Sequence, residues 1–179
     1  MQTWFKGSMI ETERLLLRPH IEADYEASCA IWADPDVVRH ISGVPSTREQ
    51  TWHRLLRAAG MWVMKGYGPF AVVEKATGRL LGEAGHHDFH RGLGETFDPY
   101  PEAGWVLGSH AHGKGVATEA VTTMLKWFDE TRPETRTVCI ISPDNPASLR
   151  VAEKVGYRPF GRMDYNGEVI MLERMRPGL

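Results

Sequence analysis

Residues 105–128 of the chain read WVLGSHAHGKGVATEAVTTMLKWF. The segment begins with apolar residues suited to the end of a strand and continues through a turn that contains Gly108, Gly113 and Gly115. From Val116 onward the apolar positions have the spacing of an amphipathic helix. Where a glycine-rich turn leads from a strand into a helix, main-chain N–H groups stay unpaired and the helix dipole favours negative charge. We therefore predict that a phosphate-bearing cofactor binds at this turn.

The composition is that of one globular domain: 179 residues, 42% hydrophobic and 25% charged. The formal net charge of -2 gives no reason to expect a general nucleic-acid-binding surface. Cys29 and Cys139 lie far apart in apolar stretches, which indicates buried free thiols in a reducing compartment. The chain shows neither an apolar run long enough to span a membrane nor a secretory signal, so we expect a cytoplasmic protein with no membrane partner. We expect residues 1–8 to form a flexible extension and residues 9–179 a single domain.

Hydrophobic periodicity and turn signals predict alternating groups of strands and helices. Ser46 and Glu49 have capping-box spacing at the start of the second helix, Asn145 is suited to cap the last one, and Asn166-Gly167 indicates a hairpin. Strands are expected over residues 12–19, 70–74, 80–90, 102–107, 135–142, 157–163 and 168–173, and helices over 22–33, 46–66, 116–128 and 145–155. This order predicts a mixed α/β fold with helices packed on one sheet.

Two nucleotide-binding motifs fit the glycine-rich turn incompletely. Gly108 to Lys114 matches the P-loop pattern G-x-x-x-x-G-K, but the next residue should be Ser or Thr to hold magnesium, and here it is Gly115. The dinucleotide-binding fingerprint would need a further glycine at Thr118. A P-loop-like nucleotide binder is therefore kept only as an alternative.

Histidines are concentrated in one third of the chain, which raises the question of a metal site. On an extended strand His86, Asp88 and His90 would share one face. The spacing of these histidines, however, matches no zinc signature. We expect a polar strand edge and no bound metal.

Several segments together resemble the GNAT acetyltransferase superfamily. Residues 112–117 resemble its pyrophosphate loop, Gln/Arg-x-x-Gly-x-Gly/Ala, and residues 102–107 look like its cofactor-binding strand. Residues 145–148, NPAS, and 153–157, EKVGY, are similar to its asparagine helix and to its Glu-Lys-x-Gly-Phe/Tyr ending. Residues 12–19, TERLLLRP, are similar to the opening of the Rim-type branch, whose members acetylate protein N-termini and other amines. The motifs occur in the family's order over nearly the whole chain.

This resemblance implies the GNAT fold, a central and mostly antiparallel sheet of about seven strands with helices on both faces. It also implies an enzyme that moves the acetyl group of acetyl-CoA to a primary amine by direct attack on the thioester. The acceptor would be a protein N-terminus or a small-molecule amine. A non-catalytic acyl-CoA-binding sensor stays open as an alternative, and so does a homodimer.

The resemblance also implies which residues hold the cofactor. Main-chain amides from Gly113 to Thr118 would bind the pyrophosphate, and a main-chain N–H of Trp105–Leu107 would polarise the thioester carbonyl. His112 stands where the family usually has Arg or Gln, which leaves the contribution of its side chain open. The full expected set is Trp105, Val106, Leu107, His112, Gly113, Lys114, Gly115, Val116, Ala117, Thr118, Asn145 and Ser148.

The catalytic groups are less clearly marked. Glu102 is our first candidate for the general base, directly or through water, with a solvated strand end as the alternative interpretation. His87 and Glu83 are the next candidates for the base. Ile140 occupies the position of a base that some family members place on the preceding strand, and so closes that route.

The sequence identifies the general acid no more clearly than the general base. The tyrosine that many members use as acid is replaced by Ala152. Ser148 remains, and its expected role is a hydrogen bond to the leaving sulfur. The acceptor amine cannot be read from the sequence, although Phe97, Asp98 and Tyr100 are candidates for shaping its pocket.

Overall fold

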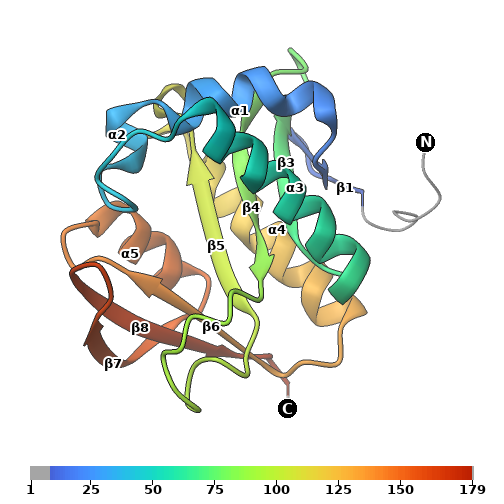
Figure 1. Cartoon of the computed structure of the whole chain (residues 1–179). Coiled ribbons are helices and arrows are strands. Elements are labelled where there is room, and N and C mark those ends of the chain that lie inside the picture. The colour runs from blue at the N-terminus through green and yellow to red at the C-terminus, as the bar shows by residue number, and fades with distance from the viewer. Residues whose placement is uncertain (1–8, 179) are drawn as a thin grey trace.

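The computed structural model describes residues 9–178, which form eight strands and five α-helices (Figure 1). The expected flexible extension, residues 1–8, lies outside the described residues. The strands are β1 (Ile10–Glu11), β2 (Leu15–Pro19), β3 (Pro69–Glu74), β4 (Leu80–His87), β5 (Glu102–Leu107), β6 (Arg136–Ile141), β7 (Arg158–Asp164) and β8 (Glu168–Met175). The helices are α1 (Tyr25–Trp32), α2 (Pro35–Val38), α3 (Arg48–Lys65), α4 (Val116–Thr131) and α5 (Pro146–Lys154).

All strands belong to one sheet, in the order β1-β2-β3-β4-β5-β6-β8-β7. Neighbouring strands are antiparallel except β5 and β6, which run parallel. The seven predicted strands are all present, and the two-residue β1 is the eighth. The prediction of a mixed α/β fold built on a mostly antiparallel sheet is therefore confirmed.

Helices cover both faces of the sheet, with α1 and α2 on one side and α4 on the other (Figure 1). On the α4 side, Val121, Met124 and Phe128 are fully buried, and they recur at the spacing of one helix face. On the opposite side, Ile31 of α1 and Val37 of α2 pack on apolar residues of β3 and β4. Apolar side chains of the helices thus pack on both faces of the sheet.

The two segments before α3 differ in detail from their predicted boundaries. The first strand was expected from Thr12 but begins at Leu15, because the Thr12 hydroxyl accepts the Leu15 N–H at 2.8 Å and turns the chain. The predicted capping box at Ser46 and Glu49 is wrong by one residue. Thr47 caps α3 instead, accepting from the Gln50 N–H at 3.2 Å while the Gln50 side chain accepts from the Thr47 N–H at 2.9 Å.

The sheet is interrupted between β5 and β6, and this interruption positions the site. β5 pairs with β4 along its whole length, whereas β5 and β6 share one pair, Glu102 with Val138. The Gly108 N–H donates to the Leu81 carbonyl of β4. Successive residues of a strand direct their N–H and C=O groups to opposite sides, so those of Trp105 and Leu107 point toward β6. Beyond Glu102 the two strands diverge, and polar main-chain groups on β5 are left available to a ligand.

Candidate active site

Two hollows meet where β5 and β6 diverge. The larger one, here called the outer cleft, has a volume of about 770 Å³ and lies between the start of α4 and α5. The smaller one, the inner cavity, has a volume of about 230 Å³ and lies against β4, β5 and β6. Both hollows are lined by His40, Ile41, Trp105, Val106, Asn145 and Ser148. A ligand in the outer cleft can therefore reach into the inner cavity past Trp105.

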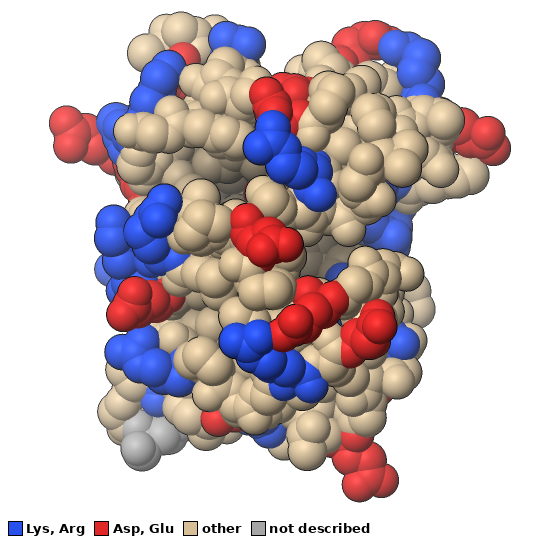
Figure 2. All heavy atoms as spheres, turned by 90° about the vertical axis from the view of Figure 1, so that its left-hand side faces the viewer, with Lys and Arg blue, Asp and Glu red and all other residues tan. Residues whose placement is uncertain are grey.

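The side of the molecule that carries α2 and α5 faces the viewer in Figure 2 and is hollowed near its middle. Basic and acidic side chains are interspersed over this face. The face shown therefore carries no broad patch of one sign of charge, and selectivity for a charged ligand must come from individual side chains within the hollows.

The glycine-rich turn forms one wall of the outer cleft. Gly113 and Gly115 both have left-handed backbone conformations, with φ of 74° and 75°. The first main-chain bond of α4 runs from the Glu119 N–H to the Gly115 carbonyl at 3.1 Å, so the N–H groups of Val116 to Thr118 have no partner within the helix. Gly115 has no side chain to cap these N–H groups, so they stay available as hydrogen-bond donors at the N-terminus of a sixteen-residue helix, an arrangement suited to an anion.

A brace behind this turn fixes its shape. The Arg14 guanidinium donates to the Glu119 carboxylate at 2.8 Å and to the Lys114 carbonyl at 3.0 Å. The Thr12 hydroxyl donates a further bond to the other oxygen of Glu119 at 2.5 Å. The brace also pairs the negative charge of Glu119, which would otherwise repel an anion at the start of α4.

His112 links the glycine-rich turn to the end of β5. Its Nε2 lies 2.9 Å from the Leu107 carbonyl oxygen, so this nitrogen carries the proton and donates. The side chain thus links the turn to the main chain of β5 while it also lines the outer cleft.

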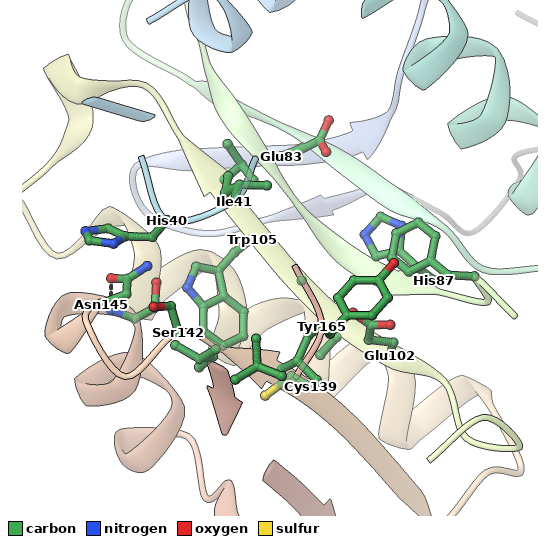
Figure 3. Close-up of a pocket in the computed structure, with 18 of the residues that line it drawn as sticks. His40, Ile41, Glu83, His87, Glu102, Trp105, Cys139, Ser142, Asn145 and Tyr165 are labelled. Carbon is green, nitrogen blue, oxygen red and sulfur yellow. Dashed lines mark hydrogen bonds between the residues drawn. The ribbon is translucent and has the colours of Figure 1, made fainter. Parts of the chain in front are cut away.

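On the facing wall, Asn145 caps α5 as predicted. Its Oδ1 accepts from the Ser148 N–H at 3.1 Å, the dashed line of Figure 3, and its Nδ2 is left to donate elsewhere. Arg150 and Lys154 of α5 also line the outer cleft and add positive charge near its rim. Anionic groups on a ligand would find donors on both walls.

The side chain of Glu102 lies at one end of the inner cavity and is 8% exposed (Figure 3). Arg91 holds it through two bonds, Nε to Oε2 at 2.6 Å and Nη2 to Oε1 at 2.9 Å. The same guanidinium donates to the Tyr165 hydroxyl at 2.8 Å. Burial raises the pKa of Glu102 and outweighs the opposing effect of Arg91, so the pKa lies above the ordinary value. The interpretation of Glu102 as a solvated strand end is wrong.

Glu83 on β4 points toward the same cavity, from the strand position opposite Val106. His20 lies 3.5 Å from its carboxylate and 3.4 Å from that of Asp24. Burial alone would raise the pKa of Glu83, but the hydrogen bond and charge of His20 outweigh burial and hold the pKa below its ordinary value. Glu83 is thus an ionised group with a cationic partner.

His87 completes the polar wall of the inner cavity. It pairs with Glu102 across β4 and β5, and its ring stacks on Phe89 with centroids 4.5 Å apart. Burial lowers the pKa of His87 to about 4, so the imidazole is neutral at physiological pH. Gly104 lies beneath the ring, and a Cβ there would stand 3.4 Å from it.

Comparison with known proteins identifies the family. The profile described as Acetyltransferase (GNAT) domain matches residues 14–158. The chain belongs to the GNAT acetyltransferase family. Two curated relatives are similar to this acetyltransferase: the uncharacterized N-acetyltransferase p20 of Bacillus licheniformis, 25% identical over 86% of this chain and 85% of the relative, and the uncharacterized N-acetyltransferase YnaD of Bacillus subtilis, 29% identical over 85% and 84%.

Solved structures agree with this assignment. A putative GNAT-family acetyltransferase from Bordetella pertussis is 32% identical, with a TM-score of 0.84 over 93% of this chain and 98% of that one. The ribosomal L7/L12 acetyltransferase RimL, solved in complex with coenzyme A, is 17% identical with a TM-score of 0.76 over 93% of this chain and 97% of that one. At 17% identity, the similarity to RimL supports the assignment of the fold and nothing further.

The predicted cofactor residues of the acetyltransferase lie together. Eleven of the twelve line the outer cleft, and the exception is Lys114, whose carbonyl is bound by Arg14. Of the candidate catalytic residues, Glu102 and Ser148 both line the inner cavity, as do Glu83 and His87. Phe97, Asp98 and Tyr100 line neither hollow, and Phe97 is 2% exposed in the core.

Several cavity residues of the acetyltransferase were not found from sequence. Arg91 comes from the long loop after β4, Tyr165 from the turn between β7 and β8, and Arg54 and Arg57 from α3. Tyr165 directly precedes the Asn166-Gly167 hairpin signal, which predicted the turn but gave no reason to place it beside Glu102. No local motif joins these segments.

The histidines of the acetyltransferase do not form a cluster. β4 ends at His87, so the expected strand face shared by His86, Asp88 and His90 is wrong. His86 packs against Phe128 on the α4 side, and the His90 side chain is 82% exposed. Among residues 9–178 no group of three or more His, Cys, Asp or Glu side chains is arranged to hold a metal ion. None of the helices in the described part of the chain is long and apolar enough to cross a membrane.

We expect the stability of the acetyltransferase to fall in alkali because of His20, whose side chain is 3% exposed. Burial alone would lower its pKa, but Asp24 and Glu83 together raise the pKa of His20 from 6.5 to about 9. A raised pKa contributes stability that is full below the unfolded-state value and is lost as the pH rises through the folded-state value. The free energy of unfolding should therefore decrease by at most about 3 kcal/mol between pH 6 and pH 10.

Urea denaturation at several pH values measures this decrease. The His20→Gln variant should show a flatter profile over the same range, whereas His90→Gln, at the exposed histidine, should follow the unmodified protein. A His20→Gln profile that decreases as steeply as that of the unmodified protein would contradict the assignment.

Proposed function

We propose that this acetyltransferase transfers the acetyl group of acetyl-CoA to a primary amine by direct attack of the amine on the thioester. The acceptor is a small-molecule amine or a protein N-terminus. One observation carries the proposal: the outer cleft, with its anion site at α4, opens into the polar inner cavity where β5 leaves β6. Such a junction allows a long phosphate-bearing thioester and an amine to enter from different directions and meet.

The outer cleft would hold the cofactor. Main-chain N–H groups from Gly113 to Thr118 bind the pyrophosphate, and Arg150 and Lys154 attract its remaining phosphate. Along β5, the main-chain groups of Trp105 and the N–H of Leu107 face the divergence and bind the pantetheine arm, while the Leu107 carbonyl stays bound to His112. One of their N–H groups polarises the thioester carbonyl and stabilises the oxyanion. The side-chain amide of Asn145 donates to pantetheine from the opposite wall.

The inner cavity would hold the reacting amine, and Glu102 is the proposed general base. Three groups there can accept a proton, and their pKa values rank them: His87 has a pKa of about 4, the pKa of Glu83 is lowered, and that of Glu102 is raised. A base works best when its pKa approaches the working pH, which favours Glu102. Although Arg91 binds both oxygens, each oxygen keeps a further lone pair for the amine or a bridging water.

The amine attacks the thioester carbon, Glu102 takes its proton, and the tetrahedral intermediate collapses to an amide and the CoA thiolate. The Ser148 hydroxyl, which lines both hollows, donates a hydrogen bond to the departing sulfur. An acceptor with an α-amino group, whose pKa is near ~8, is roughly a tenth neutral at pH 7 and so requires little of the base.

We further propose that residues 9–179 act as one N-acetyltransferase domain in the cytoplasm. The buried free thiols Cys29 and Cys139 support a reducing compartment.

Isothermal titration with acetyl-CoA tests the cofactor assignment. We expect saturable binding at micromolar concentrations that does not require magnesium. ATP with magnesium, the ligand of a P-loop, should not compete. If acetyl-CoA fails to bind at high micromolar concentration while magnesium-ATP binds, the nucleotide-binding alternative would replace the proposal.

We expect His112→Ala to weaken acetyl-CoA binding without slowing the chemical step. Removing the imidazole breaks its bond to the Leu107 carbonyl and frees the turn from β5. The loss of one such bond predicts an increase in KM for acetyl-CoA of roughly two- to tenfold. Steady-state kinetics measure it, with His112→Gln, which keeps a donor, expected to recover part of the loss. The exposed His90→Ala serves as control, and an unchanged KM in His112→Ala would refute a positioning role.

A further inference from the structure

Two arginines of α3, Arg54 and Arg57, line the inner cavity one helical turn apart. Neither guanidinium forms an ion pair with a carboxylate of the described residues. Arg54 is partly buried, and an arginine is costly to bury without an anionic partner. Arg57 is exposed, and the planar fork of either guanidinium matches a carboxylate. The two guanidinium groups are therefore available to an anion that the protein itself does not supply.

Aromatic rings hold both arginines in place. The Arg54 guanidinium stacks over Trp32 at 3.9 Å, and Trp32 is 4% exposed. The Nε of Arg54 is buried and has no hydrogen-bond partner among the described residues. The Arg57 guanidinium stands 5.1 Å over Phe89. Stacking restricts these side chains before any ligand arrives, which reduces the entropy lost on binding.

The other charges of the cavity are already paired. Arg91 binds Glu102 through two hydrogen bonds, and Glu83 lies beside the cationic His20. With both carboxylates compensated from within the protein, the charge left over on the cavity wall is that of Arg54 and Arg57. The electrostatic preference of the acceptor site is therefore for a negative group.

The position of the arginines indicates where that group would lie. Arg54 and Arg57 also line a third hollow of about 310 Å³, which Ser42, Ser46 and Gln50 border, so the two arginines stand between this hollow and the inner cavity. Glu102, where the amine would lose its proton, lines the inner cavity but not the third hollow. An acceptor extending from Glu102 toward α3 would place its far end at the arginines.

We propose that the acceptor is an amine that carries a carboxylate a few bonds from the reacting nitrogen, and that Arg54 and Arg57 bind this carboxylate. The inference rests on the proposed acetyl transfer and names its substrate class. The inner cavity, at about 230 Å³, accommodates a small amino acid or the first residues of an acidic peptide, and both sources present the same group. The positive wall also disfavours the ammonium form of the amine, which must be neutral to attack.

Matched acceptor pairs test the proposal. The small pair is 4-aminobutyrate and 4-aminobutanamide, and the peptide pair has Asp or Asn as its second residue and an amidated C-terminus. We expect kcat/KM to be roughly ten- to hundredfold higher for the carboxylate in at least one pair. A preference in the first pair alone indicates a free small acid, and one in the second pair alone indicates an acidic N-terminus. Equal rates within both pairs would overturn the proposal.

Variants locate the preference. Arg54→Gln/Arg57→Gln should reduce it to less than threefold by raising KM for the carboxylate acceptor, while the Kd for acetyl-CoA stays unchanged because neither residue lines the outer cleft. Arg57→Gln alone, at an exposed position that keeps the fold intact, should lose part of the preference. Lys126→Gln removes one charge at a 76% exposed site on α4 and should have no effect.

A carboxylate preference that survives in the double variant would overturn the proposal. If the unmodified protein acetylates no amine while binding acetyl-CoA, the proposed function itself fails. If it acetylates neutral amines as well as anionic ones, only the substrate class is wrong.

Discussion

Replacement of Glu102 by Gln should lower kcat by about 10²- to 10⁴-fold, the range typical of losing a general base. Glutamine keeps the size of the side chain and one oxygen for Arg91, but it cannot take a proton from the amine. The Kd for acetyl-CoA should not change, because Glu102 lines only the inner cavity. Stopped-flow or steady-state measurement of CoA release gives the rate, and titration calorimetry gives the Kd.

The pH profile distinguishes a base from a residue that only supports the structure. Burial raises the pKa of Glu102 above its ordinary value despite Arg91. Below that pKa the carboxyl is protonated and cannot act, so the activity of the unmodified enzyme should decrease as the pH falls through it. When the rate is expressed per neutral amine, so that protonation of the acceptor itself is removed, the acidic limb should disappear in Glu102→Gln. Tyr165→Phe, which removes the other partner of Arg91 but keeps the carboxylate, should retain the limb.

An unchanged rate and pH profile in Glu102→Gln would transfer the role of base to Glu83 or His87. Glu83→Gln and His87→Gln are then the variants that decide between them. Each of these residues lines the inner cavity, so each could reach the amine directly or through water.

The variant Gly115→Val should weaken acetyl-CoA binding by roughly ten- to hundredfold. Gly115 has φ of 75°, a conformation that a β-branched residue adopts only with strain. The turn would relax toward negative φ, and the N–H groups at the start of α4 would no longer converge on one anion. Steric crowding contributes little, since a Cβ at this position would meet only Arg14 Nη2, at 3.7 Å.

Gly78→Val provides a control of equal strain. Gly78 lies in the turn between β3 and β4 with φ of 70°, and a Cβ added there would meet no heavy atom within 4 Å. Both variants should lose similar stability, but only Gly115→Val should lose affinity. Equal affinities of Gly115→Val and the unmodified protein in calorimetry would show that the pyrophosphate binds elsewhere.

The outer cleft could be predicted from sequence because its parts are local. Gly113, Gly115 and the first turn of α4 are consecutive, and their chemistry follows from backbone conformation and the end of a helix. Asn145 caps α5 through a residue three positions away. The sheet was predicted for a similar reason, since each strand carries its own pattern of apolar residues and turn signals.

The inner cavity could not be predicted in the same way. Arg91 reaches Tyr165 across 74 residues, and the stacking of Arg54 on Trp32 joins α3 to α1. Only the packed fold shows that Glu102, at a strand end, is buried and bound by an arginine. Phe97 shows the reverse case, a loop residue suggested for the pocket that instead belongs to the core.

The most direct test of the account is CoA thiol release from acetyl-CoA by the purified protein with a panel of primary amines, combined with mass spectrometry of the acceptor. We predict amine-dependent thiol release, with one acetyl group added to the amine for each thiol set free. Saturable binding of acetyl-CoA without thiol release from any amine of the panel, including the carboxylate-bearing ones, would contradict the account and leave a non-catalytic acyl-CoA sensor.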